Sequence, residues 1–147
     1  MVTTDTNIAT VQEIYGAFGR GDVPAILELL ADDVRWEEWA DNFAQRDNAA
    51  PEMAPKTGHD GVGEFFGLVG QWEVESFDVL SIMAGGNQVA AEIEIAAKLP
   101  NGGRFRDEEL HLWGFNDEGK IDRMRHYVDT AKHIAAENGE DTVASAR

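Results

Sequence analysis

Residues with acid/base chemistry alternate along one predicted strand. His111 and Trp113 lie two residues apart, so their side chains share a face, and Asp107 and Glu109 precede them in the same alternation. An imidazole titrates near neutral pH and can exchange a proton with a substrate carbonyl. We interpret His111 as a proton donor or acceptor and Trp113 as a pocket wall. The alternative is a structural histidine that is hydrogen-bonded within the sheet.

A carboxylate follows a tryptophan at the end of an earlier predicted strand. In a regular strand Trp36 and Glu38 point to the same face, whereas Trp39 points to the other. A carboxylate against indole rings in a dry pocket has its pKa raised by desolvation, which suits a general base. We interpret Glu38 as a possible base and Trp36 as a pocket wall. The alternative is a solvated strand end in an acidic protein.

Two residues at the end of the last predicted strand complete the candidate site. Asp129 precedes a helical segment, so it either caps that helix or orients a histidine. His126 and His111 are separated by a tight turn, which places them in adjacent strands. We include His126 among the substrate-binding residues. Whether His126 or its neighbour Tyr127 faces inward stays open at this point.

Metal and phosphate motifs are missing from the sequence. The four histidines show neither H-x-H nor H-E-x-x-H spacing. The glycine pairs at 85–86 and 102–103 belong to turns, because neither opens a helix after a strand. We therefore predict no metal and no cofactor. A metal-supported lyase or oxygenase using His111 and His126 is a weaker alternative, because ligands can converge from separate strands.

The elements that must position these residues are those of one α+β domain over residues 1–147. Helical spacing of apolar residues predicts two helices before residue 31, and Asp60 can cap a third. Tight turns join the later strands, which indicates an antiparallel meander covered by helices on one face. A long loop over 40–58 and a frayed tail over 139–147 are expected. The predicted strands are 34–39, 73–83, 89–98, 104–115 and 120–128, followed by a helix over 129–137.

The charge balance and cysteine content limit the possible partners. The chain carries 28 acidic and 12 basic residues, for a formal net charge of −16, which disfavours nucleic acid and anionic membranes as partners. It has no cysteine, and neither a secretory leader nor a membrane-spanning run is visible. We predict a cytoplasmic protein whose partner is a small-molecule ligand.

Three stretches of the sequence resemble a known superfamily. They are residues 15–22 (YGAFGRGD) leading into 29–36 (LLADDVRW), residues 58–66 (GHDGVGEFF), and residues 111–115 (HLWGF) through 125–129 (RHYVD). In this order they resemble the nuclear transport factor 2-like (NTF2-like) superfamily, in its SnoaL-like and ketosteroid isomerase-related branch. The resemblance implies a cone of three N-terminal helices on a curved, mixed, mainly antiparallel sheet. It also implies a pocket for a small apolar ligand and a homodimer formed through the sheet.

The resemblance also bears on individual residues. Glu38 falls where steroid isomerases of this superfamily carry their general base. Their oxyanion-binding tyrosine and aspartic acid match Ile14 and His111, so that oxyanion hole is not reproduced, and Tyr15 is retained as pocket wall. The Asp-Arg-Asp arrangement of limonene epoxide hydrolase-like members matches Glu94, Glu92 and His126, with no arginine.

The resemblance implies an enzyme or a binding protein. The first hypothesis is cofactor-independent acid/base catalysis of isomerisation, cyclisation or dehydration on a small, partly apolar carbonyl compound. The second is a non-catalytic ligand-binding or dimerisation module of the same fold, because fold alone does not determine function.

Overall fold

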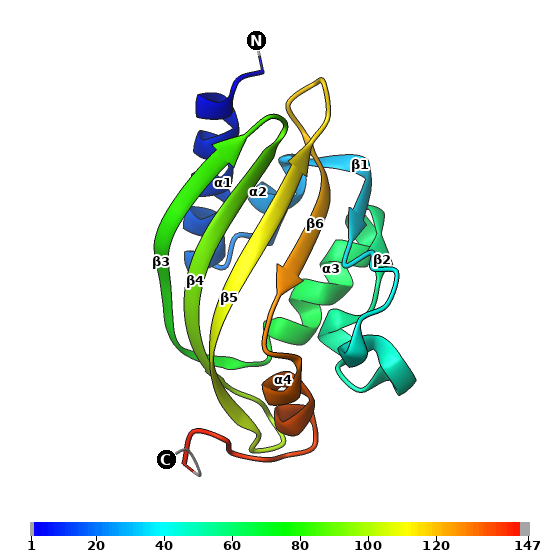
Figure 1. The fold of residues 1–147 in the computed structure, drawn as a ribbon, viewed down its shortest axis with the longest axis vertical. Helices are drawn as coiled ribbons and strands as arrows, with labels where there is room; N and C mark the ends of the chain where they lie inside the picture. Colours follow the sequence, from blue (N-terminus) through cyan, green and yellow to red (C-terminus); the bar gives the residue numbers. More distant parts are fainter. Residues whose placement is uncertain (1, 145–147) are drawn as a thin grey trace.

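The fold is a single curved sheet with helices on its concave side (Figure 1), seen in a computed structural model that describes residues 2–144. The helices are α1 (Thr4–Gly19), α2 (Val23–Glu28), α3 (Gly58–Val69) and α4 (Thr130–Glu137), with short 3-10 segments η1 (Phe43–Asn48) and η2 (Pro51–Met53). The strands are β1 (Leu30–Trp36), β2 (Lys56–Thr57), β3 (Glu73–Gly85), β4 (Gln88–Lys98), β5 (Arg104–Phe115) and β6 (Ile121–Tyr127).

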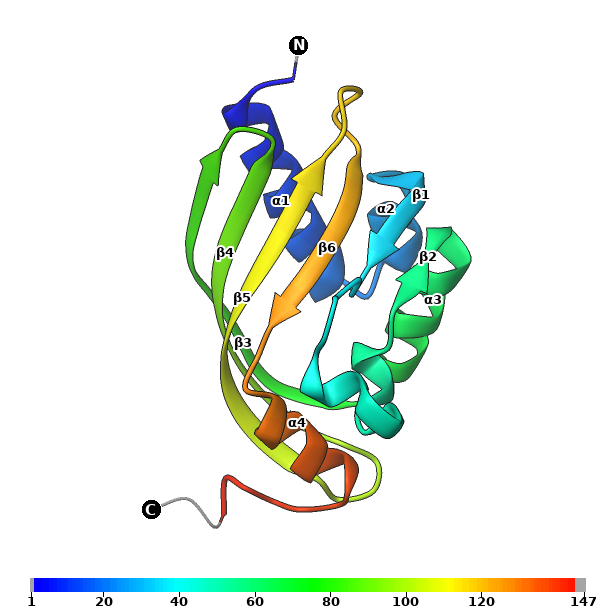
Figure 2. The ribbon, with the colours of Figure 1, turned by 45° about the vertical axis from the view of Figure 1, so that its right-hand side comes forward.

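The six strands are ordered β2-β1-β6-β5-β4-β3. All neighbouring pairs are antiparallel except β1 and β6, which are parallel. Figure 2 shows α1 behind this sheet, α3 at the right beside β2, and α4 below the end of β6. The predicted fold class, three N-terminal helices on a curved, mixed and mainly antiparallel sheet, is confirmed.

Period-two burial along β5 creates the floor of the core. Odd-numbered residues from Phe105 to Phe115 are buried, whereas most even-numbered residues are more exposed. On the helix side, Val11, Ile14 and Ala17 recur at helical spacing and pack against the sheet. The same alternation in β4 buries Ile93 and Ile95 and turns Glu92 outward, so the glutamates of β4 do not face the core.

Several predicted boundaries differ from the structure, and β1 begins at Leu30 instead of residue 34, soon after α2 ends at Glu28. Strand β1 ends at Trp36 because the next residue, Glu37, has a left-handed backbone with φ 60°. Helix α3 begins at Gly58 with Thr57 as its N-cap, so Asp60 lies inside the first turn instead of capping it. The 40–58 segment is ordered into η1, η2 and β2.

The C-terminal segment is held to the sheet beyond residue 139, which corrects the expected fraying. Backbone hydrogen bonds join Arg104 to Glu140 and to Thr142. Residues 145–147 of the predicted tail lie outside the described residues. Within residues 2–144, no helix has the length and apolar character needed to cross a membrane.

Candidate functional site

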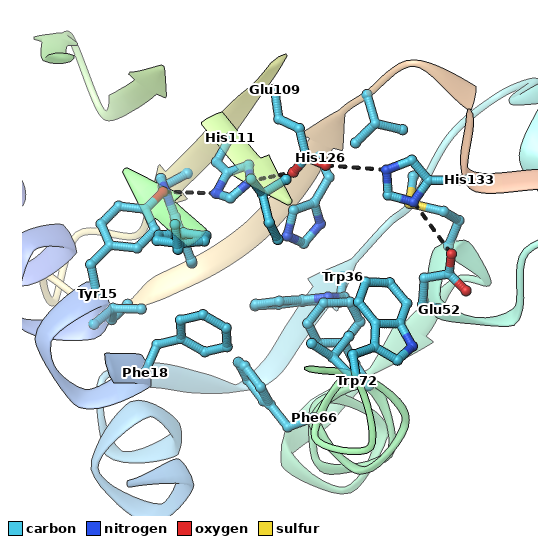
Figure 3. Close-up of a pocket in the computed structure, with 18 residues that line it drawn as sticks. Tyr15, Phe18, Trp36, Glu52, Phe66, Trp72, Glu109, His111, His126 and His133 are labelled. Carbon is cyan, nitrogen blue, oxygen red and sulfur yellow. Dashed lines mark hydrogen bonds and ion pairs between the residues drawn. The ribbon is translucent and has the colours of Figure 1, made fainter. Parts of the chain in front are cut away.

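A cavity of about 70 Å³ lies between the concave face of the sheet and helices α1 and α3 (Figure 3). Its walls are mostly aromatic, and its polar groups come from the sheet and from α1, η2 and α4. The lining residues are Ile14, Tyr15, Phe18, Trp36, Glu52, Met53, Phe65, Phe66, Val69, Trp72, Phe77, Ile95, Glu109, His111, Trp113, His126, Val128 and His133. Five of the seven predicted site residues are among them; Glu38 and Asp129 are not.

The two predicted histidines meet in this cavity. His111 on β5 is directly opposite His126 on β6, and their ring centroids are 4.5 Å apart. His126 faces inward, whereas its neighbours lie outside: Tyr127 is exposed and Arg125 stacks on the Trp39 ring. The alternation left open by the sequence is therefore settled in favour of His126.

His111 is held by hydrogen bonds at both ring nitrogens. The Tyr15 hydroxyl lies 2.8 Å from Nδ1, and Glu109 Oε1 lies 2.9 Å from Nε2. Burial, followed by the nearby His126, lowers the pKa of His111, so the ring is neutral and carries one proton. That proton is on Nε2, where the acceptor is a carboxylate, and Nδ1 accepts from Tyr15.

Tyr15 is also fully occupied. Its oxygen accepts a 3.2 Å hydrogen bond from Trp113 Nε1 while its proton goes to His111. Burial raises the pKa of the Tyr15 hydroxyl, which keeps it protonated. The hydrogen-bond chain Trp113–Tyr15–His111–Glu109 therefore uses the Trp113 N–H, the Tyr15 hydroxyl and both ring nitrogens of His111.

The chain continues to a buried histidine on α4. His133 Nε2 lies 3.1 Å from Glu109 Oε2 and 3.0 Å from Asp107 Oδ2, and Nδ1 lies 3.4 Å from Glu52 Oε1. Burial opposes the charge, but these carboxylates outweigh it and hold the pKa of His133 well above its usual value. His133 is thus a buried imidazolium surrounded by three acids.

The acids around His133 differ in protonation. Burial would raise the pKa of Glu109, yet hydrogen bonds from the two histidines hold it well below its usual value. Burial raises the pKa of Asp107, an effect that its contact with Glu109 reinforces. Glu137 adjoins Glu52, and burial together with this contact raises the pKa of Glu137 to about 8. Glu52 Oε2 is buried and has no hydrogen-bond partner among the described residues.

Asp107, Glu109 and His133 also have the residue types of a metal site. One ligand atom from each lies within 4.8 Å of the others, and all three residues are buried. Two carboxylates and an imidazole suit a divalent cation. The His133 imidazolium supplies one positive charge to these acids, so the three residues also form an ion-pair cluster.

Asp129 caps helix α4. Its side chain accepts from the Lys132 amide at 3.4 Å, and its own amide lies 3.3 Å from Asp107 Oδ2. The carboxylate does not line the cavity. Of the two roles considered for Asp129, the structure supports the cap, and its influence on the buried cluster passes through its backbone.

A second polar corner of the cavity is formed by His126, which is held by Glu37 from outside the lining. Glu37 Oε1 accepts from the backbone amide and from Nδ1 of His126, both at 2.6 Å, and Oε2 accepts from Trp39 Nε1 at 3.0 Å. Glu37 is completely buried. His126 Nδ1 is taken up by this carboxylate, whereas no residue in the described part of the chain hydrogen-bonds to Nε2.

Glu38, the predicted base, points to the surface. It forms a 3.1 Å salt bridge with Arg35, and about half of each side chain is exposed. The left-handed backbone at Glu37 interrupts the alternation on which the prediction rested, so Glu37 turns inward and Glu38 outward. Glu37 therefore replaces Glu38 in the candidate site.

One further polar atom in the cavity wall lacks a partner. Trp36 is 1% exposed, and its Nε1 has no hydrogen bond among the described residues. The Trp36 ring lies 5.8 Å from His126 and 5.9 Å from Trp113, measured between centroids. A buried N–H without an acceptor is unusual and calls for an explanation.

A groove of about 840 Å³ adjoins the cavity on the side of α2 and β3. Six side chains line both spaces, so a single layer of mostly aromatic rings separates them. These residues are Tyr15, Phe18, Phe66, Val69, Trp72 and Phe77. We call this layer the aromatic partition.

Three site residues were missed by sequence reasoning: Glu37, Glu52 and His133. Glu52 comes from η2 inside the segment that read as a loop, and Gln45 holds that segment by donating to the Glu37 and Met53 carbonyls. His133 lies on the inward face of α4 with Ala136. The helical spacing of His133 and Ala136 was the one available signal.

The fold and site agree with a family model. Residues 11–124 match the SnoaL-like domain. The chain belongs to the SnoaL-like domain family. No curated protein matches the sequence of this SnoaL-like chain.

Solved structures share the fold of this SnoaL-like domain. An NTF2-like protein of unknown function from Burkholderia pseudomallei is 26% identical, with 89% of this chain and 96% of that chain covered and a TM-score of 0.74. TerC, co-crystallised with polyporic acid, is 21% identical over 90% and 98%, with a TM-score of 0.73. RV0760c from Mycobacterium tuberculosis, in complex with estradiol-17beta-hemisuccinate, is 18% identical over 83% and 92%, with a TM-score of 0.64.

Proposed function

We propose that this SnoaL-like protein is a cofactor-independent enzyme that moves a proton on a small, partly apolar carbonyl compound. His126 is the general base, and Glu37 orients it. The observation that carries this proposal is the contrast between the two cavity imidazoles. His111 is hydrogen-bonded at both nitrogens, whereas His126 lines the cavity and its Nε2 has no hydrogen bond in the described part of the chain.

The Glu37–His126 pair supplies the chemistry of a base held by a carboxylate. Nε2 takes a proton from the carbon next to the carbonyl, and Glu37 stabilises the imidazolium that forms on its Nδ1–H side. The same imidazolium then returns the proton to another carbon or to a leaving oxygen. Isomerisation, cyclisation and dehydration share this first step, so the site supports the reaction class rather than one product.

The walls and the relatives support a ring-bearing ligand. Eight aromatic side chains other than histidine line the cavity: Tyr15, Phe18, Trp36, Phe65, Phe66, Trp72, Phe77 and Trp113. Structures of similar fold hold polyporic acid in one case and a steroid hemisuccinate in another. Flat apolar rings of this kind match an aromatic cavity.

Proton abstraction can be tested without knowing the natural substrate. We expect the protein to accelerate exchange of the α-protons of 2-tetralone in D₂O, followed by ¹H NMR. His126→Gln should slow this exchange by about 10²- to 10⁴-fold. Glu38→Gln is the matched control and should keep the wild-type rate, since Glu38 lies at the surface. A His126→Gln protein that exchanges at the wild-type rate would rule the proposal out.

A binding module is the second candidate, favoured by the fully satisfied hydrogen bonds of Tyr15 and His111. It predicts that 2-tetralone binds with no acceleration of exchange.

We also propose a homodimer, because Leu80 and Met83 on β3 are half exposed. Light scattering during size-exclusion chromatography would show a monomer if this is wrong.

A further inference from the structure

Three buried side chains from two elements converge on one point at the junction of β5 and α4. Asp107 and Glu109 lie on β5, and His133 lies on α4. His133 Nε2 is 3.0 Å from Asp107 Oδ2 and 3.1 Å from Glu109 Oε2, and each of the three side chains is at most 4% exposed. One ring nitrogen is therefore directed at two carboxylate oxygens at the same time.

Two of these side chains are held by a further hydrogen bond at their other end. Glu109 Oε1 lies 2.9 Å from His111 Nε2. His133 Nδ1 lies 3.4 Å from Glu52 Oε1, so Glu52 and Glu109 are on opposite sides of the His133 ring (Figure 3). A metal-binding histidine commonly has such a carboxylate at its second nitrogen, which fixes the tautomer and the ring orientation.

The distances at this point fit a metal ion in place of the shared proton. In a tetrahedral zinc site with bonds of about 2.1 Å, neighbouring ligand atoms are about 3.4 Å apart. The two distances from His133 Nε2, 3.0 and 3.1 Å, are close to this value, and all three ligand atoms lie within 4.8 Å of one another. A small movement of the two carboxylates is then enough to bind an ion.

The cluster also contains more buried acids than cations. Asp107, Glu109 and Glu52 are buried, and no lysine or arginine forms an ion pair with them in the described part of the chain. Glu52 Oε2 is buried and has no hydrogen-bond partner there. Excess charge in a protein interior is costly, so a proton or a cation must offset it. The convergence of three ligand atoms favours a cation.

Aromatic rings surround the histidine of this cluster. The ring centroids of Phe105 and Trp72 lie 4.4 Å and 6.5 Å from that of His133. Such an apolar shell lowers the local dielectric and strengthens the attraction between a cation and the carboxylates. The rings also favour a protonated imidazole, so a proton and a metal ion compete for Nε2.

Cations can reach the cluster from a groove as well as from the cavity. Glu109 and His133 line the cavity of about 70 Å³, which has room for a water molecule as a fourth ligand. Asp107 lines a separate groove of about 710 Å³, where acids outnumber basic residues and so attract cations. The charged residues of this groove are Glu94, Asp107, Glu108 and Asp129, against Arg106 and Lys132.

We propose that Asp107, Glu109 and His133 bind one divalent transition-metal ion of the Zn²⁺ type, which ties α4 to β5. This site goes beyond the proposed function and does not rest on it. Binding replaces the proton on His133 Nε2 with the metal ion and releases that proton to solvent. The mixed imidazole and carboxylate set favours Zn²⁺ over Mg²⁺, which prefers oxygen ligands. The histidine is 26 and 24 residues from the two acids in the sequence, so no spacing motif reveals the site.

The first measurement is isothermal titration calorimetry with ZnCl₂ on the untagged full chain, after treatment with EDTA and desalting. We expect one Zn²⁺ per chain. Asp107→Asn should weaken this binding about 100-fold or more, because it removes a charged ligand. Glu108→Gln is the matched control and should stay within about twofold, since it removes the same charge from the exposed face of β5. MgCl₂ should bind about 100-fold more weakly than ZnCl₂ or worse.

A second measurement uses the wild-type protein alone and does not depend on the folding of a variant. In protein labelled with ¹⁵N at the histidine rings, Zn²⁺ should move the Nε2 resonance of His133 and leave both ring nitrogens of His59 in place. His59 is the matched control, because a single carboxylate, Asp32, lies 3.9 Å from its ring. The His133 signals are assigned by elimination, through single substitutions of the other three histidines.

The outcomes separate a built site from general attraction of cations to an acidic protein. One Zn²⁺ per chain, weakened in Asp107→Asn and unchanged in Glu108→Gln, supports the proposal. Equal effects of the two substitutions, equal affinity for Mg²⁺ and Zn²⁺, an unmoved His133 Nε2 signal, or no binding at millimolar ZnCl₂ would overturn it. None of these readouts uses 2-tetralone, so failure of the metal site and failure of the proposed function are distinguishable.

Discussion

The two polar corners of the cavity use similar residues in opposite ways. In one corner, hydrogen bonds to neighbouring side chains occupy the Tyr15 hydroxyl and both ring nitrogens of His111, so neither residue is free to bind a ligand. In the other, Glu37 and His126 form one tight pair and leave Nε2 open beside Trp36. Both corners place a histidine of the sheet against a glutamate. The difference is that both ring nitrogens of His111 are hydrogen-bonded, whereas only one ring nitrogen of His126 is.

This contrast shows that residue type and burial do not by themselves locate a reactive group. A buried histidine with two partners stabilises the fold, because its bonds would have to break before it could serve a substrate. A buried histidine with one partner has an oriented lone pair. The four predictions below separate these two kinds of corner, from the largest expected effect to the smallest.

Removing the buried cation should have the largest effect on stability. His133→Ala leaves Asp107, Glu109 and Glu52 without their shared partner, so we expect a loss of about 3–5 kcal/mol in the free energy of unfolding. Urea denaturation followed by circular dichroism measures it. His59→Ala, at a partly exposed histidine, should cost less than about 1 kcal/mol. Equal losses in the two variants would contradict the ion-pair assignment.

Substituting the orienting carboxylate should slow the reaction. Glu37→Gln keeps the shape of the side chain but weakens the support of the imidazolium, so α-proton exchange of 2-tetralone should slow about 10²-fold or more. The neighbouring Glu38→Gln should change the rate by less than about twofold. If both variants were slowed alike, the slower exchange could not be attributed to the inward position of Glu37.

Tyr15→Phe tests the closed corner. It leaves Trp113 Nε1 and His111 Nδ1 without a partner, so the free energy of unfolding should fall by about 2 kcal/mol. Exchange catalysed by His126 should stay within about threefold of the wild-type rate. A loss of exchange comparable to that of His126→Gln would instead place Tyr15 in the reacting site.

The pH dependence of stability should show a smaller effect from Glu137. Its pKa is raised from 4.5 to about 8 in the folded protein, so the folded state binds more protons than the unfolded state between these values. Stability from this group is complete below about pH 4.5 and is lost as the pH rises to about 8. We expect about 1 kcal/mol, because partial exposure screens the charge. Glu137→Gln cannot ionise and should remove this part of the slope in urea denaturation at several pH values.

Much of the fold was readable from sequence because its signals are local. Turn residues and period-two alternation placed β4, β5 and β6 within a residue or two, and the shared face of Asp107, Glu109, His111 and Trp113 is confirmed. The site was readable only in part. The choice between Glu37 and Glu38 depends on one left-handed residue, and Glu52 and His133 come from segments that meet only through tertiary packing.

The aromatic partition has a consequence for ligand size. Its side chains line both a space of about 70 Å³ and one of about 840 Å³. Rotation or truncation of one side chain, as in Phe77→Ala, would merge the two compartments. The range of molecules that this scaffold accommodates is therefore set by rotamers and not by architecture, so selectivity can diverge between close relatives while every secondary-structure element stays in place.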